Sequence, residues 1–167
     1  MTDPTNIDVR DAEMADLPRV AALAGALVRM HHAADPARFL LVENVEGGYE
    51  WWFSREIARA EAVILVATRA HAVVGYCYGT IEDRNWNLLL DAHGALHDLF
   101  VAEEARATGV GRRLVETAVR RLEERGAPRV ILSTMIANAP AQRLFRSCGF
   151  RPTMIEMTRD STHRPGQ

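Results

Sequence analysis

The sequence RATGVG at residues 106–111 has the residue types of an anion-binding turn that leads into a helix. The first backbone N–H groups of a helix have no partners within it, and the helix dipole adds partial positive charge at the same end. Glycine at positions 109 and 111 leaves these N–H groups open to a ligand, and Arg106 and Arg112 add cationic donors. The pattern indicates a phosphate or pyrophosphate site, although a tight turn that needs glycine would have the same residues.

Composition excludes several other kinds of site. A dinucleotide-binding turn needs a third glycine where this chain has Leu114. All 20 basic residues are arginine, so the chain has neither the lysine of a P-loop nor a lysine nucleophile. Cys77 and Cys148 lie far apart in the sequence, and we expect no metal site. The net charge of -2 gives no argument for binding nucleic acid or an anionic membrane.

The elements that must position this turn follow from the apolar pattern. Strands are expected at residues 7–10, 62–68, 72–81, 95–101, 129–135 and 154–159. Helices are expected at residues 17–30, 49–60, 109–125 and 138–148. Strands that alternate with helices after a hairpin predict a mixed α/β sheet in a single domain over residues 1–160, followed by a polar tail at 161–167. No apolar run reaches the roughly 18 residues of a membrane span and no signal peptide is evident, so we expect a cytoplasmic protein.

Four segments in this order resemble the GNAT superfamily of acyl-CoA N-acyltransferases. The family signature is R/Q-x-x-G-x-G/A after a strand, and here RATGVG follows LHDLFV. The resemblance continues through GVGRRLVETAVRRLEERG, RVILSTM and NAPAQRLFRSCGF, and it covers residues 95–150. It implies a mixed, mostly antiparallel sheet with splayed central strands flanked by helices. It also implies a bacterial N-acetyltransferase that uses acetyl-CoA and can form a homodimer.

The resemblance also implies which residues bind acetyl-CoA. In the family, the fourth strand splays from the fifth and its free backbone groups pair with pantetheine; here these groups belong to Leu99, Phe100 and Val101. The pyrophosphate would bind the RATGVG turn, at Arg106, Ala107, Thr108, Gly109, Val110, Gly111 and Arg112. The cofactor arm would contact Asn138, Ala141 and Phe145. Asn138 has a second possible role, as the N-cap of the helix that follows it.

The LHDLF stretch looks most like the polyamine and thialysine acetyltransferase branch. The general base of that branch is a carboxylate just before the aspartate of this strand, and His97 stands at the matching position. Free histidine has a pKa of about 6.5, which suits a base at neutral pH. Asp98 is the alternative base, and a water-mediated or absent base is the third. Since strand side chains alternate, only one of the two residues is expected to face the acceptor amine.

One departure from the family concerns the general acid. Family members usually carry a tyrosine that protonates the leaving thiolate, and the matching residue here is Phe145, which cannot donate a proton. General acid help is typically worth about 10²–10⁴ in rate. Cys148, one turn further along the same helix, is a conceivable substitute. The loss of the tyrosine motivates a second hypothesis, a catalytically weak or inactive sensor or regulatory module that binds acyl-CoA.

The acceptor is predicted only as a class, a small-molecule or peptide amine. Its binding residues are expected in the first two helices and in the excursion before the fourth strand, where Glu82, Asp83 and Trp86 lie. Carboxylates beside an aromatic ring would suit a cationic amine. Solvated loop charges beside a core tryptophan are the alternative interpretation.

Overall fold

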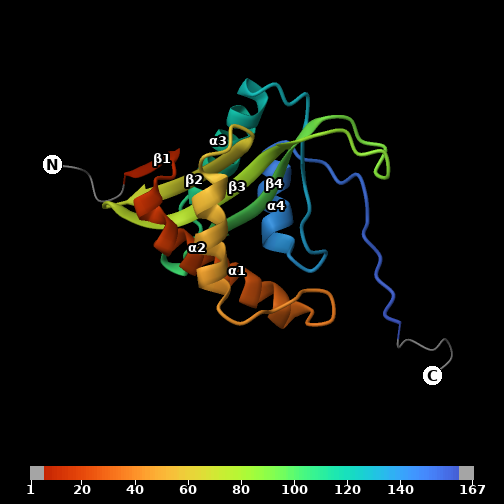
Figure 1. Ribbon diagram of the computed structural model, residues 1–167, viewed down its shortest axis with the longest axis horizontal. Coiled ribbons are helices and arrows are strands. Elements are labelled where there is room, and N and C mark those ends of the chain that lie inside the picture. The colour runs from red at the N-terminus through yellow and green to blue at the C-terminus, as the bar shows by residue number, and fades with distance from the viewer. Residues whose placement is uncertain (1–5, 162–167) are drawn as a thin grey trace.

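The computed structural model describes residues 6–161, which form a five-stranded sheet with the order β1-β2-β3-β4-β5 (Figure 1). The strands are β1 (Ile7–Asp11), β2 (Ala62–Arg69), β3 (Ala72–Glu82), β4 (His93–Val101) and β5 (Val130–Leu132). The helices are α1 (Leu17–Ala34), α2 (Val45–Glu56), α3 (Val110–Glu124) and α4 (Ala139–Ser147), with short 3-10 turns at Met14–Asp16 and Glu103–Ala105. Neighbouring strands are antiparallel except for β4 and β5. The predicted mixed, mostly antiparallel sheet is therefore confirmed.

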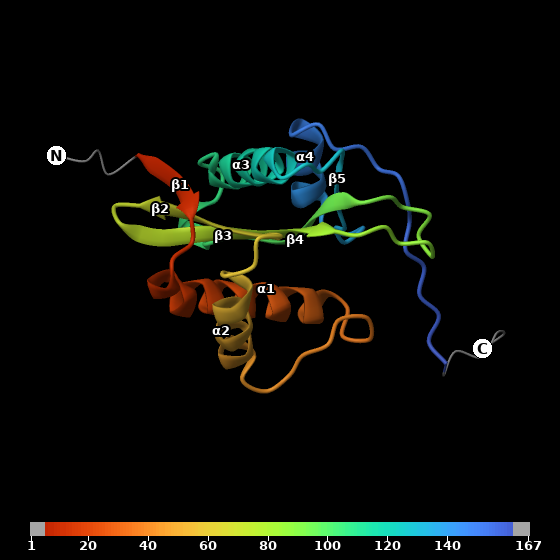
Figure 2. The ribbon, with the colours of Figure 1, turned by 45° about the horizontal axis from the view of Figure 1, so that its top comes forward.

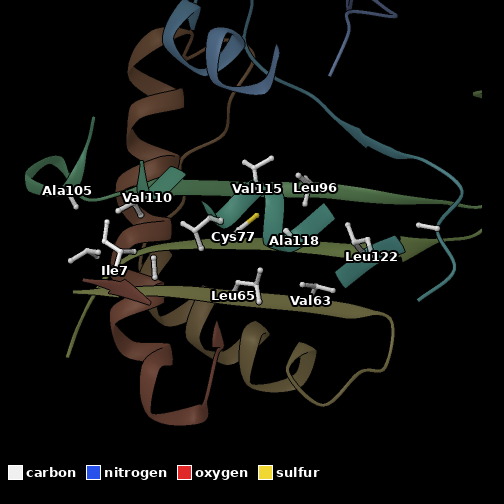
Figure 3. Packing of buried hydrophobic residues seen from close by; sticks show 14 residues of the cluster. Ile7, Val63, Leu65, Cys77, Leu96, Ala105, Val110, Val115, Ala118 and Leu122 are labelled. Atoms are coloured by element: carbon white, nitrogen blue, oxygen red, sulfur yellow. The ribbon is translucent and has the colours of Figure 1, made fainter. Parts of the chain in front are cut away.

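The sheet lies between two helical layers, with α1 and α2 on one face and α3 and α4 on the other (Figure 2). Because strand side chains alternate, β2 and β3 contribute buried side chains to the cores on both faces of the sheet. Val63, Leu65 and Cys77 face the core that also contains α3, whereas Val66 and Tyr76 face the core beneath α1 and α2. The predicted apolar stripe of α3 packs on this sheet, as Figure 3 shows for its buried residues Val110, Val115, Ala118 and Leu122.

A β-bulge interrupts the pairing of β4 with β3. Asp98 pairs with Tyr78 and Leu96 pairs with Gly79, so His97 is an extra residue between the two pairs. A bulge of this kind changes the alternation of side chains along the strand that contains it.

The bulge corrects the expectation that His97 and Asp98 face opposite sides of the sheet. Leu96 and Leu99, the residues on either side of them, both pack in the core of α3. The Asp98 carboxylate accepts a hydrogen bond from Tyr76, which belongs to the other core. The His97 ring lies 5.2 Å from the ring of Tyr78, in that same core. Both candidate bases therefore face the layer of α1 and α2, because alternation holds only in a regular strand.

The splay between β4 and β5 is also present. Only residues 94–96 of β4 pair with residues 130–132 of β5, and from His97 onward no described residue pairs with β4 on that side. The predicted gap between the central strands is confirmed. The strand expected at 129–135 is correspondingly short.

The last predicted strand, at residues 154–159, is wrong. The described residues after Gly149 form no helix or strand, and Met154, Ile155 and Met157 are exposed. Their apolar side chains fit a strand, but none of the strands within residues 6–161 pairs with them. An ion pair between Arg38 and Glu156 links this segment to the loop after α1. The predicted polar tail at 161–167 lies beyond the described residues except for Ser161.

The second helix begins one turn earlier than expected, at Val45 rather than near Tyr49. Asn44, in a left-handed conformation with φ of 51°, accepts a hydrogen bond from the Gly47 N–H and caps the helix there. Within residues 6–161, no helix is both long and apolar enough to cross a membrane.

Candidate active site

The predicted anion-binding turn leads into α3 without a side-chain cap. Gly109 is the N-cap with φ of 86°, and Ala107 also has a positive φ of 59°. The Thr108 hydroxyl donates a hydrogen bond to the carbonyl of Ala105 at 2.7 Å and closes the turn on itself. The N-cap residue makes no side-chain hydrogen bond to the first backbone N–H groups of α3. These N–H groups are therefore suited to bind a pyrophosphate.

The two glycines of the turn have different roles. A Cβ on Gly109 would meet nothing within 4 Å, so its requirement for glycine comes from the positive φ. A Cβ on Gly111 would lie 3.1 Å from the Leu144 side chain, so this glycine lets α4 approach α3. The packing of α4 thus accounts for the glycine at 111, and the positive φ accounts for the glycine at 109.

Both predicted arginines of the turn have protein partners. The Arg106 guanidinium donates to the carbonyl of Val101 at 3.0 Å and lies over the ring of Phe100. The Arg112 guanidinium donates to the carbonyl of Ser147 at 2.9 Å, at the end of α4. These bonds fix both cations beside the turn and the gap between β4 and β5.

The backbone N–H and C=O groups of β4 point alternately toward β3 and toward the gap between β4 and β5. The Ala102 N–H donates to the carbonyl of Val74 at 2.8 Å, toward β3. Since backbone groups alternate along a strand, the backbone groups of Phe100 also point toward β3, and those of Leu99 and Val101 point into the gap where the cofactor is expected to bind.

A cavity of about 80 Å³ lies where β4 and β5 separate. It is lined by Leu27, Met30, His31, Leu96, His97, Asp98, Leu99, Ser133, Thr134, Asn138, Ala141 and Phe145. The structure thus brings both candidate bases together with the residues expected to contact the cofactor arm. His31, on the first of the two helices expected to contribute to the acceptor site, reaches the cavity from α1.

The α4 residues of the cavity have mixed roles. The Asn138 side chain accepts a hydrogen bond from the Ala141 N–H at 3.1 Å, so it caps α4 as expected. Phe145 presents its ring to the cavity. Cys148 packs against the α3 core and does not line the cavity, and burial raises the pKa of its thiol. The structure gives no support to Cys148 as a substitute acid.

Two tyrosine–carboxylate pairs lie at the site, and one of them includes the candidate base Asp98. The Tyr76 hydroxyl donates to Asp98 at 3.0 Å, and the Tyr78 hydroxyl donates to Glu56 at 2.7 Å. Burial raises the pKa of Asp98 above its ordinary value, against the opposing effects of the Tyr76 hydroxyl and of nearby His97. Burial acts on Glu56 in the same direction, but hydrogen bonds from Tyr78 and Arg59 bring its pKa below the ordinary value.

His97 has polar partners on β3. Its Nε2 atom lies 2.7 Å from the Thr80 hydroxyl and 3.4 Å from the Glu82 carboxylate. The Thr80 hydroxyl also donates a hydrogen bond to Glu82. Glu82, predicted to bind the acceptor, is therefore engaged with the candidate base.

The other two residues predicted to bind the acceptor lie outside the cavity. Asp83 and Trp86 are exposed, the latter by 74%. The excursion that carries them closes on itself through a bridge between Asn85 and Leu90 and an ion pair between Arg84 and Asp91. Over residues 6–161, no cluster of histidine, cysteine and carboxylate side chains is arranged to hold a metal ion.

Comparison with protein families gives one match that covers most of the chain. Residues 26–150 match the model of the acetyltransferase (GNAT) family. An N-alpha-acetyltransferase of Sulfurisphaera tokodaii is 30% identical over 124 residues, which cover 71% of this chain and 72% of that protein. A D-amino-acid N-acetyltransferase of Saccharomyces cerevisiae is 37% identical over a shorter stretch of 60 residues, 36% of this chain and 37% of that protein.

Solved structures with the same fold are more distant in sequence. The aminoglycoside N-acetyltransferase AAC(6')-Iy, solved in complex with CoA, superposes with a TM-score of 0.75 at 16% identity and covers 95% of this chain and 96% of its own. Glucosamine-6-phosphate N-acetyltransferase from Arabidopsis thaliana superposes with a TM-score of 0.67 at 18% identity, over 93% of this chain and 99% of its own.

Proposed function

The chain belongs to the GNAT acetyltransferase family, and from this premise we propose that it moves an acetyl group from acetyl-CoA to a primary amine of a small molecule or peptide. Transfer is direct, within a ternary complex. The observation that carries the proposal is the cavity at the splay of β4 and β5, which joins His97 and Asp98 to the α4 residues Asn138 and Phe145.

The chain's own groups fit the donor. The uncapped N-terminus of α3 offers backbone N–H groups and a positive dipole end for the pyrophosphate. The free backbone of Leu99 and Val101 is available to the amide groups of pantetheine. The Val101 N–H, rather than that of Phe100, would polarise the thioester carbonyl, since stabilising charge on this oxygen is a large part of acyl-transfer catalysis.

His97 accepts the proton of the acceptor. An alkylamine has a pKa of about 10.4 and is mostly protonated at neutral pH, so it must lose a proton before it can attack the carbonyl carbon. The amine nitrogen then forms the new amide bond while the carbon–sulfur bond breaks and the thiolate leaves. With Phe145 on the cavity, no tyrosine among its lining residues protonates that thiolate.

The acceptor is a cationic amine. Asp98 places a carboxylate on the cavity, and the ring of Tyr78, packed edge to face with Trp52, lies beside His97 on the same side of the sheet. Carboxylates and aromatic faces together favour an ammonium group. This composition supports the polyamine-like class suggested by the LHDLF stretch.

The test is release of free CoA thiol from acetyl-CoA in the presence of polyamines, aminoglycosides, amino acids and short peptides. We expect amine-dependent turnover, strongest with di- or polycationic amines. His97→Ala should lower kcat/KM by about 10²-fold, the lower end of what a general base contributes. Glu124→Gln, an exposed carboxylate on the far end of α3, serves as a control and should leave turnover unchanged.

The second candidate, a sensor that binds acyl-CoA without efficient turnover, rests on Phe145. It predicts tight binding of acetyl-CoA by calorimetry and no increase in thiol release with any amine of the panel. Tight binding without turnover would exclude the proposed acetyltransferase activity and, with it, the role of His97 as a base.

A further inference from the structure

Building on the proposed function, we propose that Glu82 and Thr80 hold neutral His97 with its proton on Nε2, so that Nδ1 is the atom that takes the proton of the acceptor. Glu82 and Thr80 are then positioning residues, and Glu82 is not a contact for the acceptor. The proposal specifies one nitrogen of one ring and follows from the direction of two hydrogen bonds.

The direction of both hydrogen bonds can be assigned starting from the Glu82 carboxylate. Glutamate is ordinarily ionised at neutral pH, and an ionised carboxylate can only accept hydrogen bonds. The Thr80 hydroxyl has a single proton and donates it to Glu82. The Thr80 oxygen can therefore only accept at its 2.7 Å contact with Nε2 of His97, and Nε2 must carry the ring proton. The Glu82 carboxylate, 3.4 Å from Nε2, is compatible with the same assignment.

Nδ1 is left with the lone pair. In neutral imidazole one nitrogen is a donor and the other an acceptor. Among the described residues, the hydrogen bonds and ion pairs of His97 all involve Nε2. Because the β-bulge turns the His97 side chain to the same face as Asp98, the ring lines the cavity, with Nε2 bonded to β3 and Nδ1 without a partner among the described residues.

The same arrangement accommodates the ring after it has taken the proton. The acceptor's N–H bond breaks, its electron pair stays on the amine, and the new bond forms at Nδ1, while the Nε2–H bonds to β3 remain in place. The charged groups that face the ring are Glu82 on β3, Asp98 on β4 and Glu56 on α2, with His31 on α1 beside Asp98. Arg59 pairs with Glu56, so Glu82 and Asp98 are the carboxylates that stabilise a positively charged ring.

His31 differs from His97 in the nitrogen it offers. Its Nδ1 lies 2.9 Å from the carbonyl of Leu27, which can only accept, so Nδ1 of His31 carries the proton. The two imidazoles of the cavity therefore have opposite tautomers. A measurement that distinguishes the two ring nitrogens also distinguishes the two histidines.

The first experiment uses ¹⁵N NMR of the full chain at a pH where the rings are neutral. Long-range ¹H–¹⁵N correlations should show a protonated Nε2 and an unprotonated Nδ1 for His97, assigned among the six histidines by comparison with His97→Gln. Glu82→Gln is the sharpest variant, because an amide can donate to Thr80 and so permits the reverse direction. We expect the Nδ1–H tautomer to appear in this variant, and Thr80→Ser to keep the native tautomer.

The second experiment is kinetic. Glu82→Gln and Thr80→Val should each lower kcat about tenfold, with KM for acetyl-CoA unchanged, as expected when part of the contribution of a general base is lost. Thr80→Ser should restore most of the rate. A purely structural role of Thr80 would alter thermal stability without changing the tautomer.

The proposal is overturned if native His97 shows a proton on Nδ1, or if Glu82→Gln and Thr80→Val leave both the tautomer and kcat unchanged. The tautomer is measured without substrate. Failure of the proposed function, seen as absence of turnover with every amine, is thus distinguishable from failure of this inference.

Discussion

Asp98 shows how a single residue can have conflicting requirements. Its carboxylate accepts a hydrogen bond from Tyr76, which is fully buried, and it also lines the cavity of the active site. Burial raises its pKa because a charged carboxylate loses hydration there, and Tyr76 and two histidines only partly offset this loss. The residue therefore stabilises cationic groups in the cavity at a cost to the stability of the fold.

We expect Asp98→Asn to increase stability at neutral pH. Because the pKa of Asp98 is raised in the folded state, the contribution of this residue is greatest below the unfolded pKa of about 3.9 and decreases as pH rises through the folded pKa. Asparagine does not ionise, and its amide oxygen can still accept from Tyr76. The advantage of the variant, measured by urea unfolding, should be present at pH 7 and shrink toward pH 4.

Asp16→Asn is the matched control with the opposite sign. Its hydrogen bond from Arg10 lowers the pKa of Asp16, so the stability it contributes is present above the unfolded pKa and lost as pH falls. This variant should be less stable than the native chain at pH 7. Equal destabilisation by both substitutions at pH 7 would contradict the assignment for Asp98.

At the scale of elements, the start of α3 can be tested apart from backbone strain. Gly109 and Gly126 lie at opposite ends of α3 with φ of 86° and 92°, and an added Cβ would meet nothing within 4 Å at either. Alanine in this conformation costs about 1–2 kcal/mol, so both Gly109→Ala and Gly126→Ala should lose similar stability. Only Gly109→Ala should weaken CoA binding, by about tenfold or more, as calorimetry would measure. Equal affinity of the two variants would place the pyrophosphate elsewhere.

The elements that could be predicted are those whose signal is local. The stripe of α3 and the RATGVG turn depend on residue spacing and on glycine, which the sequence displays directly. The bulge at His97 could not be predicted, because its cause is the register with β3 and no residue of LHDLF requires it. The positions of Asp83 and Trp86 could not be predicted either. The sequence does not reveal that the excursion closes on itself through a contact between Arg84 and Asp91.

The C-terminal segment shows the same limit. Met154, Ile155 and Met157 have the residue types of a strand, but a strand also needs a neighbour, and the sequence does not say where that neighbour is. The described chain leaves these side chains exposed, with Met157 at 90%.

At the scale of the whole molecule, two segments at the same end of the fold carry exposed apolar side chains. The β3–β4 excursion and the C-terminal segment both lie away from the N-terminus (Figures 1 and 2). They carry Trp86, Leu88, Leu89, Met154, Ile155 and Met157, all exposed. Exposed apolar side chains are typical of an interface where they lie together, and we propose that these two segments contribute to a homodimer in solution.

Light scattering after size exclusion tests the homodimer. We expect twice the mass of the 18.6 kDa chain. Substituting Ile155→Ser and Met157→Ser together should shift the protein toward the monomer, because the apolar area available to a second copy is reduced. Met14→Ser, at an exposed apolar residue just before α1, should leave the mass unchanged. A monomer for the native chain at micromolar concentration would contradict the proposal.

The bulge of β4 consists of one extra residue, His97, and a single codon in the gene encodes it. Without His97, Leu96 and Asp98 would be adjacent in a regular strand, and each would stay on the face of the sheet that it now occupies. Both cores would keep their residues, and only the imidazole would disappear. A single in-frame insertion or deletion can therefore add or remove a base at this site without repacking the protein.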